Sequence, residues 1–260
     1  MWRPDWLPFF RPSPCVLRLG QAHFQLWQVN GRRLELLASR PSTHIRYNDY
    51  QAIADELAAL GKDLPGATSV QFLADSKWMP LSLIATGHAP LSGVQIQGLA
   101  KHRFVDVFGE QAQTWSVQTN YVSGDTQTLA FACPDGLLTA VRQGQLQIQS
   151  MQPTLCWAWN QVWRHEAAKT DKWLVLAEHD RSVMARIANG RLIGLQPAGP
   201  LLTSTAQLAA ALPTHALRCS LDETDHTALG VSLEPRPDMT QVSPTAGIRW
   251  HAAGVTEVLA

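Results

Sequence analysis

Two stretches of the chain repeat one pattern of apolar and polar positions. Residues 15–39 and 172–196 each contain an apolar strand, a short turn, an alternating strand, an Asn-Gly turn and a third strand. The Asn-Gly pairs at 30–31 and 189–190 readily adopt the positive φ angles of a tight hairpin turn. Because the same three-stranded meander occurs twice, the pattern predicts an internally duplicated fold.

The remaining apolar positions follow helical spacing in some stretches and strand spacing in others. Helices are predicted at residues 48–60 (capped by Asn48), at 92–108 (capped by Ser92), from Pro134 onward, at 154–168 and at 205–212. Strands are predicted at residues 68–74, 77–84, 114–121, 127–133, 145–151 and 216–221, with weaker patterns at 229–234 and 247–251. This order predicts a mixed α/β fold.

Composition narrows the classes of function. Charged residues make up 16% of the 260 positions, against roughly 25% in average soluble domains, which suits a chain that works inside an assembly. The formal net charge is zero and the Lys and Arg residues are scattered, so nucleic-acid binding is not expected. The four cysteines form no C-x-x-C pair, so neither a metal site nor a disulfide framework is expected, and a reducing compartment is the simpler interpretation.

Membrane insertion is not expected either. The uncharged stretches 79–100, 143–163 and 192–217 are each interrupted by Pro, Gly, Gln or Ser, whereas a spanning helix needs roughly 20 predominantly apolar residues. The first fourteen residues are rich in Pro and aromatic residues and show no secretory signal.

The layout of the chain resembles the actin-like superfamily, and more closely the pilus-assembly protein PilM and the cytoplasmic domain of the type II secretion protein GspL. Their first strand ends in Asp-Ile-Gly, where this chain reads Arg18-Leu19-Gly20. Residues 129–142 (LAFACPDGLLTAVR) and 146–160 (LQIQSMQPTLCWAWN) follow the outline of the strand, helix, short strand and alanine-rich helix in the middle of these proteins. The resemblance implies two ribonuclease-H-like subdomains with mixed sheets flanked by helices.

We expect four segments. Residues 1–14 form an N-terminal arm, 15–152 the first ribonuclease-H-like half, 153–222 a second and shortened half, and 223–260 a C-terminal extension.

The resemblance also identifies where a nucleotide would bind. Actin-like ATPases hold phosphates in two hairpin turns, using backbone N–H groups beside a glycine and an acidic residue in each strand. Here Arg18 takes the first acidic position, although Gly20 is kept. In the second repeat the corresponding residues are Leu176 and Glu178. The losses imply a catalytically silent relative that binds no cofactor, although Asp180 could be a displaced carboxylate.

PilM-like proteins bind the cytoplasmic tail of a membrane partner and contact the assembly ATPase at the inner face of the inner membrane. The resemblance therefore implies a scaffold of a type IV pilus or type II secretion-like assembly platform. Two sets of aromatic residues are candidates for partner contacts. The first is in the arm, which could equally pack on its own domain: Trp2, Trp6, Phe9 and Phe10. The second is Trp157, which helical geometry directs away from the predicted buried face of its helix.

Two alternatives remain open at this stage. The first is an active actin-like ATPase or kinase with displaced ligands. The second is a secreted binding module that uses some of its ten Trp residues as sugar platforms. The polar clusters at 178–180 and 222–226 could be acid/base or metal sites, but their positions favour solvated turns and loops.

Overall fold

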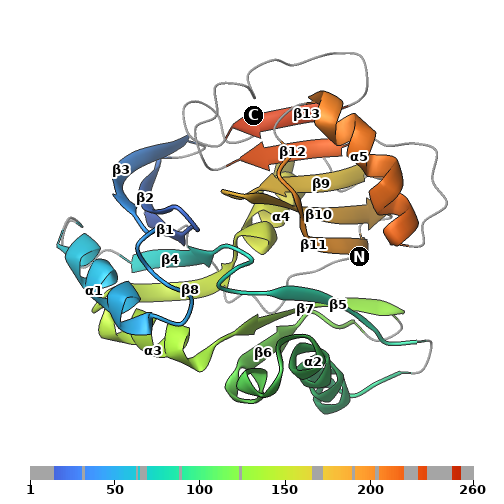
Figure 1. Cartoon of the computed structure of the whole chain (residues 1–260), viewed down its shortest axis with the longest axis horizontal. Helices are drawn as coiled ribbons and strands as arrows, with labels where there is room; N and C mark the ends of the chain where they lie inside the picture. Colours follow the sequence, from blue (N-terminus) through green and yellow to red (C-terminus); the bar gives the residue numbers. More distant parts are fainter. Residues whose placement is uncertain are drawn as a thin grey trace.

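A computed structural model of the protein describes residues 15–30, 33–62, 64, 69–87, 90–122, 125–165, 172–188, 191–202, 205–219, 228–232 and 248–252. Within these ranges the strands form two five-stranded mixed sheets and one three-stranded antiparallel sheet. Figure 1 shows the first sheet beside α1 and α3, the second beside α5, and the small sheet beside α2. The predicted mixed α/β class is confirmed.

The first sheet begins with the predicted meander. Its strand order is β3 (Arg33–Pro41), β2 (His23–Asn30), β1 (Cys15–Leu19), β4 (Ser69–Ala74) and β8 (Gln147–Pro153). The meander strands pair antiparallel, whereas β1 with β4 and β4 with β8 are parallel.

The second sheet repeats this order and these directions. It runs β11 (Arg191–Pro200), β10 (Arg181–Ala188), β9 (Lys172–Ala177), β12 (Ala228–Ser232) and β13 (Ile248–Ala252). Again the meander is antiparallel and the last two pairings are parallel. The duplication predicted from the two meanders is therefore confirmed.

The predicted division into segments remains a prediction, with one addition from the structure. Strands β12 and β13 come from the predicted C-terminal extension, yet they pair within the second sheet. Part of residues 223–260 therefore belongs structurally to the second half.

The small sheet is an insertion between β4 and β8. It consists of β5 (Leu81–Ala85), β7 (Gln127–Cys133) and β6 (Ser116–Thr119), with α2 (Gly93–Phe108) and the 3₁₀ helix η1 (Glu110–Thr114) packed on it. Its β5–β7 edge lies close to β11 of the second sheet. Below, "first half" means the first sheet with its helices and this insertion, and "second half" means the second sheet with α5.

Helices cover the outer faces of the sheets and one helix lies between them. α1 (Tyr50–Gly61) and α3 (Asp135–Gln143) pack with the first sheet, and α5 (Thr205–Arg218) packs with the second. α4 (Thr154–His165) lies between the two sheets in Figure 1. One apolar cluster joins α4 to both sheets: Val16, Trp27, Leu73, Leu155, Trp157, Trp159, Leu174 and Leu176 are among its members.

Most predicted elements are present with shifted ends. The side chain of Asp49, and not Asn48, accepts from Ala52 N at the start of α1. Ser92 caps α2 as predicted, in a capping box with Gln95. The strand predicted from residue 77 begins only at Leu81, because the Asp75 carbonyl accepts from the backbone N–H groups of residues 78 and 79 in a turn.

The strand predicted at 216–221 is wrong in its described part. Residues 216–218 belong to α5, which is longer than expected. Leu208, Leu212 and Ala216 are buried at helical spacing, so their packing on the second sheet continues the helix past Pro213.

Candidate functional site

The two hairpin turns that would hold phosphates are built alike and face each other. Gly20 N donates to His23 O at 3.0 Å in the first turn, and Glu178 N donates to Arg181 O at 2.9 Å in the second. Leu19 pairs with Phe24 as Ala177 pairs with Ser182. Arg18 therefore corresponds to Leu176, and Gly20 to Glu178, as the sequence comparison of the two repeats predicted.

One direct contact joins the tips of these turns. The Gln21 Nε2 atom donates to Asp180 Oδ2 at 2.7 Å. A hydrogen bond from the Arg181 guanidinium holds the pKa of Asp180 below its usual range. Asp180 is thus an exposed, ionised carboxylate that is already paired.

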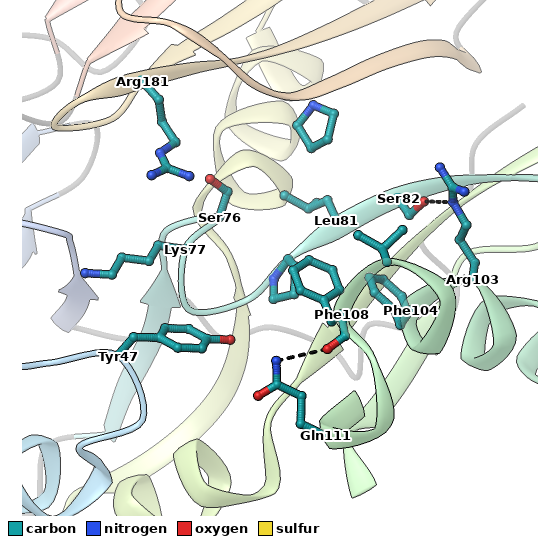
Figure 2. Close-up of a pocket in the computed structure, with 13 residues that line it drawn as sticks. Tyr47, Ser76, Lys77, Leu81, Ser82, Arg103, Phe104, Phe108, Gln111 and Arg181 are labelled. Carbon is teal, nitrogen blue, oxygen red and sulfur yellow. Dashed lines mark hydrogen bonds between the residues drawn. The ribbon is translucent and has the colours of Figure 1, made fainter. Parts of the chain in front are cut away.

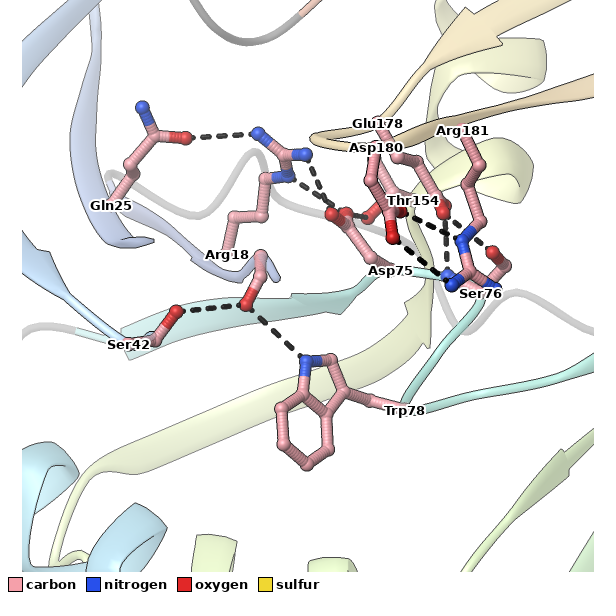
Figure 3. Close-up of polar contacts among 11 residues, drawn as sticks. Arg18, Gln25, Ser42, Asp75, Ser76, Trp78, Thr154, Glu178, Asp180 and Arg181 are labelled. Carbon is pink, nitrogen blue, oxygen red and sulfur yellow. Dashed lines mark hydrogen bonds and ion pairs between the residues drawn. The ribbon is translucent and has the colours of Figure 1, made fainter. Parts of the chain in front are cut away.

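Arg18 lies in a buried ion pair. Its Nε donates to Asp75 Oδ1 at 2.8 Å and its Nη2 donates to Asp75 Oδ2 at 2.7 Å, with both side chains fully buried. The third nitrogen, Nη1, donates to Gln25 Oε1 at 3.0 Å, and Thr154 Oγ1 donates to Asp75 Oδ1 at 2.9 Å (Figure 3). This bidentate geometry satisfies two charges that burial would otherwise penalise heavily.

Glu178 reaches from the second half into the first. Its Oε1 accepts from Ser76 N at 2.8 Å and its Oε2 accepts from Ser76 Oγ at 2.5 Å, and the residue is 1% exposed. Burial, and then the nearby Asp75 carboxylate, raise the pKa of Glu178 to about 8, although the Ser76 hydrogen bonds and Arg18 oppose the shift. In Figure 3 this contact lies beside the ion pair.

The approach to Gly20 is filled by the protein itself. A Cβ added at Gly20 would lie 2.8 Å from His23 O and 3.5 Å from both Arg18 Cζ and Asp75 Oδ2. The Gly20 N–H is used within the turn, and its carbonyl accepts from Ser42 Oγ at 3.1 Å and from Trp78 Nε1 at 3.3 Å. The backbone N–H of Gly20, which could otherwise donate to a phosphate, is therefore already engaged.

Leu176 has no polar role. It is fully buried in the apolar cluster around α4. Within the described parts of the chain, no group of three or more His, Cys, Asp or Glu side chains could hold a metal ion.

Asp75 and Ser76 are not among the predicted site residues; they lie between the strands predicted at 68–74 and 77–84. A weak signal was available, because an acidic residue directly after a buried strand often lies at a functional sheet edge. The partners of these residues are 57 and 102 positions away in the chain, so the contacts themselves could not be inferred.

A groove opens beside this network. It has a volume of about 420 Å³ and lies between α2, β5, the turn after β4 and the second sheet (Figure 2). Its apolar lining consists of Tyr47, Pro80, Leu81, Phe104, Val107, Phe108 and Pro197. Its polar lining consists of Ser76, Ser82, Gln111, Lys77, Arg103 and Arg181, with no carboxylate among the lining residues.

The predicted partner residues lie elsewhere. Trp157 is only 4% exposed, so the interpretation that it points away from the core is wrong: α4 lies between two sheets and has no free face there. Trp2, Trp6, Phe9 and Phe10 lie outside the described residues, and their role stays a prediction.

The Trp residues whose side chains are described are all buried. Trp27, Trp78, Trp115, Trp157, Trp159 and Trp173 are each at most 5% exposed. These six therefore offer no platform for a sugar ring. Among the described residues, no disulfide joins Cys15, Cys133, Cys156 or Cys219.

No helix in the described part of the chain is both long and apolar enough to cross a membrane.

Comparison with known proteins gives a structural match. No protein-family model and no curated protein sequence matches the chain. Its structure is similar to one in the "PilM-PilN type IV pilus biogenesis complex", with a TM-score of 0.61, 13% identity and coverage of 95% of this chain and 91% of the other.

Two further solved structures share the architecture. One is the cytoplasmic domain of EpsL, an inner-membrane component of the type II secretion system of Vibrio cholerae, with a TM-score of 0.52 and 12% identity over 93% of this chain and 90% of the other. The other is a Bacteroides thetaiotaomicron protein with an actin-like ATPase fold and unknown function, with a TM-score of 0.55 and 11% identity over 89% and 87%. The chain therefore has the actin-like fold.

Proposed function

We propose that this protein is a catalytically silent, actin-like scaffold in a type IV pilus or type II secretion-like assembly platform. It binds the cytoplasmic tail of a membrane partner at the inner face of the inner membrane. A pilus or secretion ATPase is a further candidate contact.

One observation gives the main support for the proposal that the site binds no nucleotide. The buried Arg18–Asp75 ion pair covers Gly20, the small residue beside which a phosphate would bind. Arg18 cannot ligate Mg²⁺, because hard cations need oxygen ligands. Glu178 adds a carboxyl group at the second turn, where its steric bulk, and its charge when ionised, oppose an incoming anion.

The fold neighbours support the assembly role. One belongs to a complex of PilM with PilN, and another is a domain of an inner-membrane component of a secretion system. A scaffold of this shape needs a surface for its partner, and the groove beside α2 supplies a concave, mostly apolar one.

The groove favours a partner segment with apolar side chains and a carboxylate. Phe104 and Phe108 line one wall, while Lys77 and Arg103 bring positive charge without a carboxylate in the lining. Aromatic walls supply the buried area that dominates affinity, and the cations orient the segment.

A titration with Mg-ATP tests catalytic silence. Trp78 donates to Gly20 O, so a nucleotide entering the first turn would change the fluorescence of this indole. We expect no saturable change in fluorescence up to about 1 mM Mg-ATP. A dissociation constant of that size corresponds to a binding free energy of roughly −4 kcal/mol.

The competing enzyme hypothesis makes the opposite prediction. Asp180 is the ionised carboxylate at the facing turns, so it is the residue that displaced-ligand chemistry would use. Saturable micromolar binding that is lost in Asp180→Ala would refute the silent scaffold.

Tail binding is tested with two matched variants of α2. Val107 lines the groove and is 54% exposed, while Val94 is 81% exposed on the same helix and does not line it. The probes are synthetic peptides that match the cytoplasmic tails of membrane proteins encoded beside this chain. We expect Val107→Asp to weaken binding of the cognate peptide about tenfold or more, and Val94→Asp to change it less than about twofold.

Equal effects of the two variants would contradict the groove as the binding site. Deletion of residues 1–13 in the same assay tests the arm. An unchanged affinity would remove Trp2, Trp6, Phe9 and Phe10 from the contact.

A further inference from the structure

Three of the polar contacts among the described residues join the two halves of the molecule. They are Glu178 with Ser76, Gln21 with Asp180, and the ion pair of Arg191 Nη1 with Asp125 Oδ1 at 2.7 Å. They differ in burial: Arg191 is 50% exposed and the Gln21–Asp180 contact is exposed, whereas Glu178 and Ser76 are 1% and 8% exposed.

The buried contact has the chemistry of anion binding. The Glu178 carboxyl group accepts from a backbone N–H and from a hydroxyl of the same residue, Ser76. A phosphate oxygen in a nucleotide site accepts from the same kinds of donor. In this chain the acceptor is covalently part of the second half, and its donors are part of the first.

This contact also adjoins the groove. Ser76 lines the groove from the first half, and Arg181 and Pro197 line it from the second. Figure 2 places Ser76 and Arg181 on the same side of the groove, with Phe104 and Phe108 of α2 across from them. The relative position of the halves therefore determines the shape of that side.

We propose that Glu178 holds the two halves closed through Ser76, where a nucleotide would otherwise bridge them, and that this closure forms one wall of the groove. In an enzyme of this fold, a bound nucleotide joins the halves only while it is present. Here the bridging group is a side chain of the protein itself, so the groove forms without nucleotide.

The inference rests on the proposed function only for the role of the groove in binding a partner. Hydrogen exchange of the whole protein, without nucleotide or peptide, tests it independently of that role. Failure of the peptide assay would not affect the conclusion from hydrogen exchange. Failure of the hydrogen-exchange test would likewise not affect the conclusion from the peptide assay.

The decisive variant is Glu178→Ala, with Glu178→Gln as its matched control. We expect Ala to speed exchange about tenfold in the turn after β4, in the part of α2 that lines the groove, and at the β9–β10 turn, because both hydrogen bonds between Ser76 and the Glu178 carboxyl group are lost. Gln preserves the shape, accepts from Ser76 N through its carbonyl oxygen and donates to Ser76 Oγ, so its exchange should match that of the parent.

Two results would overturn the proposal. Faster exchange at Ser76 alone would mean that Glu178 only accepts a hydrogen bond from one amide and does not hold the two halves together. A uniform increase that extends through α1, none of whose residues lines the groove, would mean general destabilisation.

Two further variants keep the test interpretable. Ser76→Ala retains the amide donor and should give a smaller change in the same segments, even if Glu178→Ala does not fold. Gln21→Ala removes an exposed contact between the halves and should leave exchange in the groove within about twofold.

Discussion

The two hairpin turns have one backbone design and opposite chemistry. At equivalent positions the first turn carries Arg18 and Gly20, and the second carries Leu176 and Glu178. Arg18 pairs inside its own half with Asp75, while Leu176 packs in the apolar cluster between the sheets. Of these four residues, only Glu178 reaches across to the other half with its side chain.

The difference shows that equivalent positions of two similar turns can be stabilised in different ways. A buried charge is tolerated where hydrogen bonds and a counter-charge satisfy it, and an apolar residue is stable where packing surrounds it. The first turn is stabilised within its half, and the second turn stabilises the junction of the halves. The predictions below test this contrast.

The largest loss of stability is expected when Arg18 of the first turn is replaced by leucine, the residue at the equivalent position 176 of the second turn. Arg18→Leu leaves Asp75 buried without its counter-charge, and breaking such a pair costs about 3–5 kcal/mol. Urea unfolding followed by circular dichroism measures the free energy of unfolding. Leu176→Met is the control, because a swap of similar volume costs less than about 1.5 kcal/mol. A loss below about 1 kcal/mol in Arg18→Leu would show that the ion pair is not needed.

The second prediction concerns pH. The folded pKa of Glu178 is raised from 4.5 to about 8, so the folded state prefers the protonated form. Stability from this preference is fully present below the unfolded pKa and is lost as pH rises through about 8, because the unfolded chain releases its proton first. Glu178→Gln removes this dependence.

Thermal unfolding between pH 5 and 9 checks the sign of this effect. The melting temperature of Glu178→Gln relative to the parent should rise with pH, by about 2–4 °C for each kcal/mol that ionisation costs. A parent protein that gains stability relative to the Gln variant between these pH values would contradict the assignment.

The smallest effect is expected at the tips of the turns. Gln21→Ala removes a hydrogen bond to Asp180 that is exposed to solvent, and such contacts contribute about 0–1 kcal/mol. The same urea titration should detect little change. A loss comparable to that of Arg18→Leu would mean that the exposed tips, and not the buried groups, hold the turns together.

Much of the fold could be predicted from local patterns. The Asn-Gly turns and the alternating strands gave both meanders, and Ser92 with Gln95 marked the start of α2. Helical spacing misplaces Trp157, because it indicates one buried face and α4 is covered from both sides. The end of α5 was missed because Pro213 and the following apolar residues read locally as a break and a strand.

The sequence by itself determined that the phosphate positions are altered, since Arg18, Leu176 and Glu178 are fixed by their place in each repeat. Only the tertiary structure decided what those residues do instead. Asp75 and Ser76 directly follow β4, which pairs in parallel with β1. This pairing brings Asp75 to Arg18, 57 residues away, whereas the packing of the two halves brings Ser76 to Glu178, 102 residues away. Spacing along a chain predicts which face a side chain occupies, but the burial and partners that set its charge state arise only when the two sheets meet.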